Sequence, residues 1–226
     1  MDKTDNALAL LEAALESGEI DEQDWYREVA AVLTPAYLAQ DDPRGQSGYS
    51  GDEAHWRQAR ELVVDGIDRD GTFLDVGCAN GYLMESIQRW ARERGRVMEP
   101  YGLDISPQLA DLARRRLAHW AERVYVGNAI NWQSPMRFGF VRTGLEYVPV
   151  RRQRDLLERL LHEVVAPAGR LIIGAFKEES DETRAEPSQE ELVARFGFTI
   201  GGRSERPHYC DDYLVYRVFW IDAPDN

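Results

Sequence analysis

The chain is 226 residues long, with 43% hydrophobic and 30% charged residues. This composition is typical of a globular protein, and the length accommodates one large α/β domain or a domain with an appendage. Forty acidic against 27 basic residues give a net charge of −13. Such a surface repels phosphate backbones, so we expect no nucleic acid partner.

Membrane and secretory classes are also disfavoured by the sequence. No apolar run approaches the roughly 20 residues that a bilayer span needs, and the acidic, amphipathic start lacks the pattern of a signal peptide. Cys78 and Cys210 lie far apart and show no zinc-binding spacing. We therefore expect a cytoplasmic protein with reduced cysteines, no metal site and no membrane partner.

Two short helices are predicted at the start of the chain. The first ends near Gly18, and the second begins near Asp21 and ends before Pro35. A stretch rich in Gly, Pro, Ser and Asp follows, which is typical of a loop. We expect residues 1–50 to form a helical lid over a site in the main domain, residues 51–226.

After a third helix that ends at Gly66, strands alternate with helices. The expected strands are TFLDVG (72–77), YGLDIS (101–106), VYVGNA (124–129), RFGFVRTG (137–144), RLIIGAF (170–176), FGFTIGG (196–202) and YLVYRVFWI (213–221). This order predicts a doubly wound α/β fold with a mostly parallel, seven-stranded sheet and helices on both faces. Ligands of such sheets bind at the carboxyl edge of the strands, where we expect the functional loops.

The run LDVGCANGY (74–82) leads from a buried strand through a glycine bend into a helix. Gly77 and Gly81 allow a sharp turn and a close approach of a ligand. Asp75 can meet an amino group, and Asp104, which ends the next strand, can accept hydrogen bonds from two ribose hydroxyls. Each feature alone also fits a plain turn or a carboxylate at a helix start.

The middle position of the bend separates two cofactor classes. The dinucleotide fingerprint has a glycine there, whereas this chain has Ala79, preceded by the acid Asp75. This arrangement argues against a pyrophosphate and for a ligand with a positive end. An NAD-dependent oxidoreductase, which shares the strand, glycine bend and helix, stays an alternative.

These motifs together resemble the class I S-adenosylmethionine-dependent methyltransferases over roughly residues 50–221. The similar segments are LDVGCANG (74–81), GLDIS (102–106), VGNAINW (126–132), FGFVRTGLEYVP (138–149) and LLHEVVAPAGRLIIGAF (160–176). The resemblance implies S-adenosylmethionine as the cofactor. The contacts it implies are Asp75, Gly77, Cys78, Ala79, Asn80, Gly81, Tyr82, Asp104, Ile105, Ser106, Asn128, Ala129, Arg142 and Leu145. The chain departs from the family pattern at Asn128 and Gly139, where acids are usual.

Three residues are candidates for work on the acceptor. Arg142 ends the fourth strand and could clamp a carboxylate or phosphate, or form a surface ion pair. Tyr147 could orient a substrate or simply pack, and His208 could act as a base or be an exposed loop histidine. The resemblance implies methyl transfer to O or N of a small molecule. A non-catalytic adenosyl-binding protein is a further alternative, and the oligomeric state is not indicated.

Overall fold

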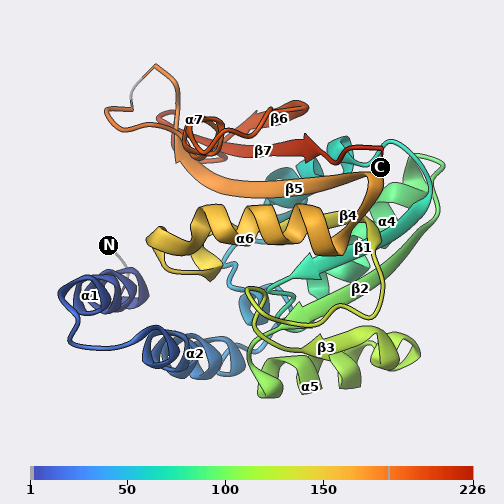
Figure 1. Ribbon diagram of the computed structural model, residues 1–226. Coiled ribbons are helices and arrows are strands. Elements are labelled where there is room, and N and C mark those ends of the chain that lie inside the picture. The colour runs from blue at the N-terminus through green and yellow to red at the C-terminus, as the bar shows by residue number, and fades with distance from the viewer. Residues whose placement is uncertain (1–2, 183, 226) are drawn as a thin grey trace.

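The computed structural model describes residues 3–182 and 184–225. Within these residues the strands form one seven-stranded sheet in the order β3-β2-β1-β4-β5-β7-β6 (Figure 1). The strands are β1 (Gly71–Val76), β2 (Met98–Asp104), β3 (Val124–Val126), β4 (Phe138–Thr143), β5 (Val165–Glu179), β6 (Gly202–Pro207) and β7 (Leu214–Asp222). The pairs among β1 to β5 are parallel, and β7 runs antiparallel to both β5 and β6. The expected mostly parallel sheet is confirmed.

The helices alternate with the strands, as expected for a doubly wound fold. The α-helices are α1 (Lys3–Ser17), α2 (Glu22–Leu38), α3 (Glu53–Arg60), α4 (Tyr82–Glu93), α5 (Pro107–Arg116), α6 (Gln153–Arg159) and α7 (Gln189–Arg195). Several continue as tighter or wider turns: η2 (Glu61–Gly66) after α3, η3 (Ala118–Arg123) after α5, and the π-helical η6 (Leu160–Val164) after α6. In the described part of the chain, no helix combines the length and apolarity of a membrane span.

Side chains of the central strand β1 alternate between two apolar layers. Leu74 and Val76 belong to the core that includes α6 and part of α2, whereas Phe73 belongs to the core beneath α3, η2 and α4. Figure 1 shows α6 lying across one face of the sheet. Helices therefore cover both faces.

The first two helices pack against each other and against the main sheet domain. They lie together, far from the β6–β7 hairpin (Figure 1, blue). Leu15 and Trp25 join the core beside α6. The Arg152 guanidinium lies 2.9 Å from the Glu22 carboxylate at the start of α2, which anchors this helix to the main domain.

Two sequence predictions of element bounds are wrong. Helix α2 continues through Pro35 to Leu38. A proline so near the end of a helix removes only one backbone hydrogen bond. The Ala39 N–H still donates to Pro35 O at 3.0 Å and closes the last turn. The run 196–202 is not a strand. Its alternating apolar residues Phe198 and Ile200 pack against the core instead, and β6 begins only at Gly202, with a polar, edge-type sequence.

Candidate active site

A cavity of about 560 Å³ lies where the carboxyl ends of β1, β2 and β4 meet the N-terminal helices. Its floor comes from the loops after β1 to β4, and its opposite wall comes from α2 and the loop around η1 (Gly45–Ser47). The segments 177–187 and 201–212 contribute no lining residue among those described. Residues of α1, α2 and the η1 segment line the cavity opposite the strand ends.

The glycine bend after β1 forms the centre of the floor. Gly77 has φ +73°, and a Cβ there would lie 2.7 Å from the Tyr147 ring, so only glycine fits. Ala79 also has a left-handed backbone, with φ +46°. Its N–H donates to the Asp104 carboxylate at 2.7 Å, which ties the bend to the end of β2.

Asp104 is nearly buried, and both of its oxygens already accept backbone hydrogen bonds. The N–H of Ser106 donates to Oδ1 at 2.8 Å, while Ala79 N–H donates to Oδ2. Burial raises the pKa of Asp104 to about 6, although these two bonds favour the ionised form. Each carboxylate oxygen keeps a free lone pair for a ligand, so the two hydroxyls of a ribose can bind here.

Asp75 and Arg142 form a buried ion pair beside this loop. Arg142 Nη1 donates to Asp75 Oδ1 at 3.2 Å, to Val76 O at 3.3 Å and to Tyr147 Oη at 2.8 Å. Burial raises the pKa of Asp75 to about 6 even though Arg142 opposes the shift. Burial also raises the pKa of the Tyr147 phenol, so Tyr147 keeps its proton at neutral pH and cannot serve as a base.

Two polar side-chain atoms of lining residues, Trp25 Nε1 and Arg142 Nε, are buried without a hydrogen-bond partner in the described residues. Buried polar groups in folded proteins are nearly always satisfied. The Tyr26 phenol is directed to Asn128, and the Tyr49 phenol to Tyr216.

The residues proposed from the sequence divide into two sets. Those that line the cavity are Asp75, Gly77, Cys78, Ala79, Asp104, Ile105, Ser106, Asn128, Ala129, Arg142 and Tyr147. Those that lie outside the lining are Asn80, Gly81, Tyr82, Leu145 and His208. Cys78 is buried, and this burial raises the pKa of its thiol, which fits a small packing residue and not a reactive one.

His208 lies in the turn after β6, which does open at the carboxyl edge of the sheet. The turn belongs to the far end of the sheet, however, and the structure does not bring His208 to the cavity. Its ring stacks with Tyr209 and Tyr216 at centroid distances of 4.8 and 4.9 Å. A role as base for a reaction inside the cavity would require it to move.

Asn80 joins the glycine loop to the N-terminal segment. Its amide nitrogen donates to Pro43 O at 2.9 Å, and its amide oxygen accepts from Ser47 Oγ at 2.6 Å. A second buried contact runs from Thr34 Oγ1 to Ser106 Oγ at 2.9 Å. These bonds hold α2 and the η1 segment directly onto the loops that form the floor.

Sequence reasoning missed most of the wall opposite the floor. It did not single out Tyr26, Thr34, Tyr37 or Arg60, all of which line the cavity. The sequence does contain one signal of this wall, the adjacent Trp25-Tyr26 pair. Neighbouring residues of a helix point in different directions, so the apolar face of one helix cannot bury both rings against the same partner.

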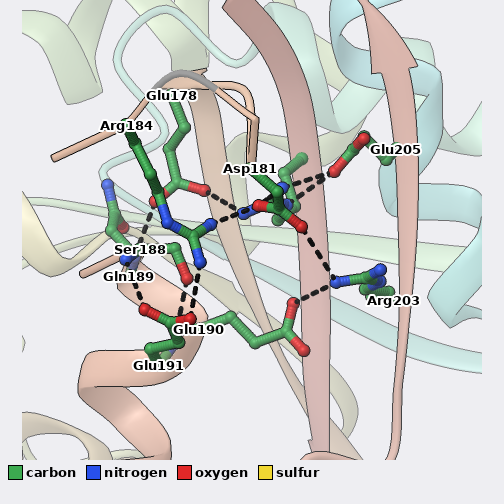
Figure 2. Close-up of polar contacts among 10 residues, drawn as sticks. Glu178, Asp181, Arg184, Ser188, Gln189, Glu190, Glu191, Arg203 and Glu205 are labelled. Carbon is green, nitrogen blue, oxygen red and sulfur yellow. Dashed lines mark hydrogen bonds and ion pairs between the residues drawn. The ribbon is translucent and has the colours of Figure 1, made fainter. Parts of the chain in front are cut away.

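The acidic segment after β5 proves to be held by arginines. The sequence suggested either a loop that steers a cationic substrate or a mobile, solvated loop. Figure 2 shows Asp181 at the centre of an ionic cluster with Arg184 and Arg203. The Arg217 guanidinium, 1% exposed, lies within 3.0 Å of the carboxylates of Glu178, Asp181 and Glu205. These acids are neutralised within the protein, which leaves them little attraction for a ligand.

Comparison with known proteins gives matches by structure. No protein-family model matches the chain, and curated proteins give no significant sequence match. A Burkholderia thailandensis 1,6-didemethyltoxoflavin-N1-methyltransferase, solved with its substrate and S-adenosylhomocysteine, has a TM-score of 0.63 and 20% identity, covering 91% of this chain and 92% of that chain. A Geobacter sulfurreducens S-adenosylmethionine-dependent methyltransferase with bound S-adenosylhomocysteine has a TM-score of 0.52 and 16% identity, with 84% and 97% covered.

The same architecture also occurs in a protein named for a different reaction. The [4+2]-cyclase SpnF has a TM-score of 0.60 and 15% identity, covering 91% of this chain and 95% of that chain. At such identities the likeness concerns the fold. This chain has the Rossmann-like fold of the class I S-adenosylmethionine-dependent methyltransferases.

Proposed function

We propose that this protein is an S-adenosylmethionine-dependent methyltransferase that acts on O or N of a small-molecule acceptor. The observation that carries the proposal is the convergence of the Gly77 bend, the Asp104 carboxylate and Asn128 on one cavity. A volume of about 560 Å³ falls in the usual range for small-molecule sites. The fold and the S-adenosylhomocysteine in two of its structural neighbours support the same cofactor.

The residues of the cavity fit an adenosyl cofactor. Asp104 would take the ribose hydroxyls, and the Asn128 amide would meet the adenine edge. The bend at Gly77 would pass the methionine part, since a side chain at this position is sterically excluded. Trp25 and Tyr26 of α2 lie on the wall that would close over this ligand.

When bound, this cofactor supplies a strongly electrophilic methyl group on a charged sulfur. The chain then needs mainly to hold a nucleophile in line at roughly 3–3.5 Å and to exclude water. Helix α2 and the η1 loop perform the exclusion. Arg142 stays charged and Tyr147 stays protonated, so both can orient an acceptor. Neither of them can remove a proton at neutral pH.

Ligand binding and turnover separate this proposal from its alternatives. We would measure thermal shifts with S-adenosylhomocysteine, S-adenosylmethionine and NAD, expecting roughly 2.7 kcal/mol of stabilisation at 100 times the dissociation constant of a true ligand. A response to NAD alone would refute the proposal. Binding of the adenosyl ligands without transfer of labelled methyl to any compound of an acceptor panel would favour the non-catalytic alternative.

A residue-level test uses a matched pair of acids. Asp104→Ala should weaken S-adenosylhomocysteine binding by at least about ten-fold, the effect of losing hydrogen bonds to a charged group. Asp111→Ala, which removes an exposed acid of α5 paired only with Arg114 in the described chain, should leave the affinity unchanged. Equal affinities of the two variants would show that the ribose contact is misassigned.

A further inference from the structure

The cavity contains an arginine whose charge no acid of the described chain neutralises. Arg60 and Arg142 are the two cations of the described lining. Arg142 has Asp75 as its partner, whereas the Arg60 guanidinium makes no hydrogen bond or ion pair with any described residue. It lies instead over the rings of Phe176, Trp56 and Tyr49, with 3.8 Å to the Phe176 centroid and 5.3 Å to each of the other two.

The surroundings of Arg60 penalise its positive charge. Burial and then repulsion from Arg142 lower the pKa of Arg60 to about 10. The acids that border the cavity form no ion pair with Arg60. Asp75 and Asp104 are engaged by Arg142 and by backbone N–H groups, and the exposed Glu146 carboxylate folds back over Gly144 and attracts Arg60 only at longer range. A half-buried guanidinium that faces a cavity without a paired acid is suited to an anionic ligand.

The position of Arg60 relative to the strands places its anionic partner on the acceptor side of the cavity. The groups suited to the adenosyl ligand follow β1, β2 and β3. Arg60 instead meets Phe176 from β5 and lies near Arg142 from β4, on the other side of β1. Arg142 lies close enough to Arg60 to repel its charge. An anion bound at Arg60 would therefore be attracted by a second guanidinium as well.

We propose that Arg60, with the charge of Arg142 beside it, binds a carboxylate carried by the methyl acceptor. Aromatic rings line this part of the cavity, so the acceptor has a flat body that packs against them. A guanidinium matches a carboxylate through two parallel hydrogen bonds, which also fixes the orientation of the acceptor. This inference rests on the proposed methyltransferase function and names its substrate class.

A pair of probes that differ only in charge tests the assignment. Benzoate and benzamide would be titrated by ligand-observed NMR into the full chain saturated with S-adenosylhomocysteine. Benzoate should bind at least about ten-fold more tightly, as expected for one charge-assisted hydrogen bond. Arg60→Met should abolish the preference, and Arg60→Lys should keep part of it. Arg69→Met, which removes an exposed arginine stacked on Phe140 outside the cavity, should keep all of it.

The alternative source of a carboxylate is the amino-acid end of the cofactor. S-adenosylhomocysteine has this end and 5′-methylthioadenosine lacks it. If Arg60→Met weakens binding of the first and spares the second, Arg60 serves the cofactor and the proposal is overturned. Equal binding of benzoate and benzamide to the unmodified chain, or binding of neither, also overturns it, and this result needs no variant to fold. If the unmodified chain binds no adenosyl ligand, the methyltransferase function itself is refuted.

Discussion

The carboxylate of Asp75 and the guanidinium of Arg142 face each other at 3.2 Å with side chains 1% and 5% exposed. Two charges so fully withdrawn from water depend on each other, because the removal of one leaves the other without compensation. The pair also fixes the bottom of the cavity, through the further bond from Arg142 to Tyr147.

Arg142→Met should therefore lower the free energy of unfolding by about 3–5 kcal/mol. The double variant Asp75→Asn with Arg142→Met should lose less than the sum of the single losses, because neither charge is then left alone. Urea unfolding of the four proteins measures this coupling. Arg154→Met, which breaks only an exposed pair with Glu158 in the described chain, should change stability by less than about 1 kcal/mol. Strictly additive losses would show that the pair is not coupled.

The buried acids should make stability depend on pH below neutrality. The pKa of Asp104 rises from 3.8 in its ordinary state to about 6 in the folded chain, so the folded protein holds a proton that the unfolded chain releases. The stabilisation is complete below about pH 4 and is lost as the pH rises through about 6, a change of about 1–3 kcal/mol. Asp75 acts in the same direction.

Urea unfolding of the ligand-free protein across this pH range measures the effect. Asp104→Asn should flatten the slope, and Asp111→Asn, at an exposed site of α5, should not. A slope unchanged in Asp104→Asn would mean that Asp104 titrates near its ordinary pKa.

Asn80→Ala should loosen the η1 segment from the loops that form the floor of the cavity. The substitution leaves Pro43 O and Ser47 Oγ without their partner, at a cost of about 1–3 kcal/mol for unsatisfied groups. Hydrogen exchange of residues 40–50 should increase more than exchange of the sheet. Asn131→Ala, at an exposed asparagine whose side chain makes no hydrogen bond within the described chain, serves as the control. Unchanged exchange around η1 would argue that other contacts hold the segment.

The ionic cluster of Figure 2 should matter for the local structure and not for the cavity. Arg217→Met removes the buried cation shared by three acids and leaves the largely buried Glu178 without this partner, so amide exchange in 178–191 should rise and stability should fall by about 3–5 kcal/mol. Affinity for S-adenosylhomocysteine should stay unchanged in the folded fraction, because the described lining includes none of these residues. Arg203→Met, at a half-exposed arginine of the same cluster, should have a much smaller effect.

The sequence predicted the sheet and its glycine bend well, for a definite reason. Buried parallel strands are short apolar runs, and Gly77 and Asp104 follow such runs at positions set by local backbone geometry. Strand β6 was missed because Gly202–Pro207 is an edge strand of charged residues, whose pairing depends on β7 and not on its own pattern.

The lining of the cavity was only half predictable. Residues contributed by strand ends, such as Asp104 and Asn128, can be placed from topology alone. Arg60 and Tyr26 reach the cavity because α3 and α2 dock onto the sheet in particular orientations, and no local pattern encodes a docking angle. His208 shows the converse, since it lies at the correct edge of the sheet but too far along it.

The bonds from Asn80 to Pro43 and from Thr34 to Ser106 have a thermodynamic corollary. A molecule that touches both α2 and the strand ends must favour the closed arrangement by as much as closure favours the molecule. Binding of such a molecule in the cavity and protection of the first fifty residues against protease should therefore increase together.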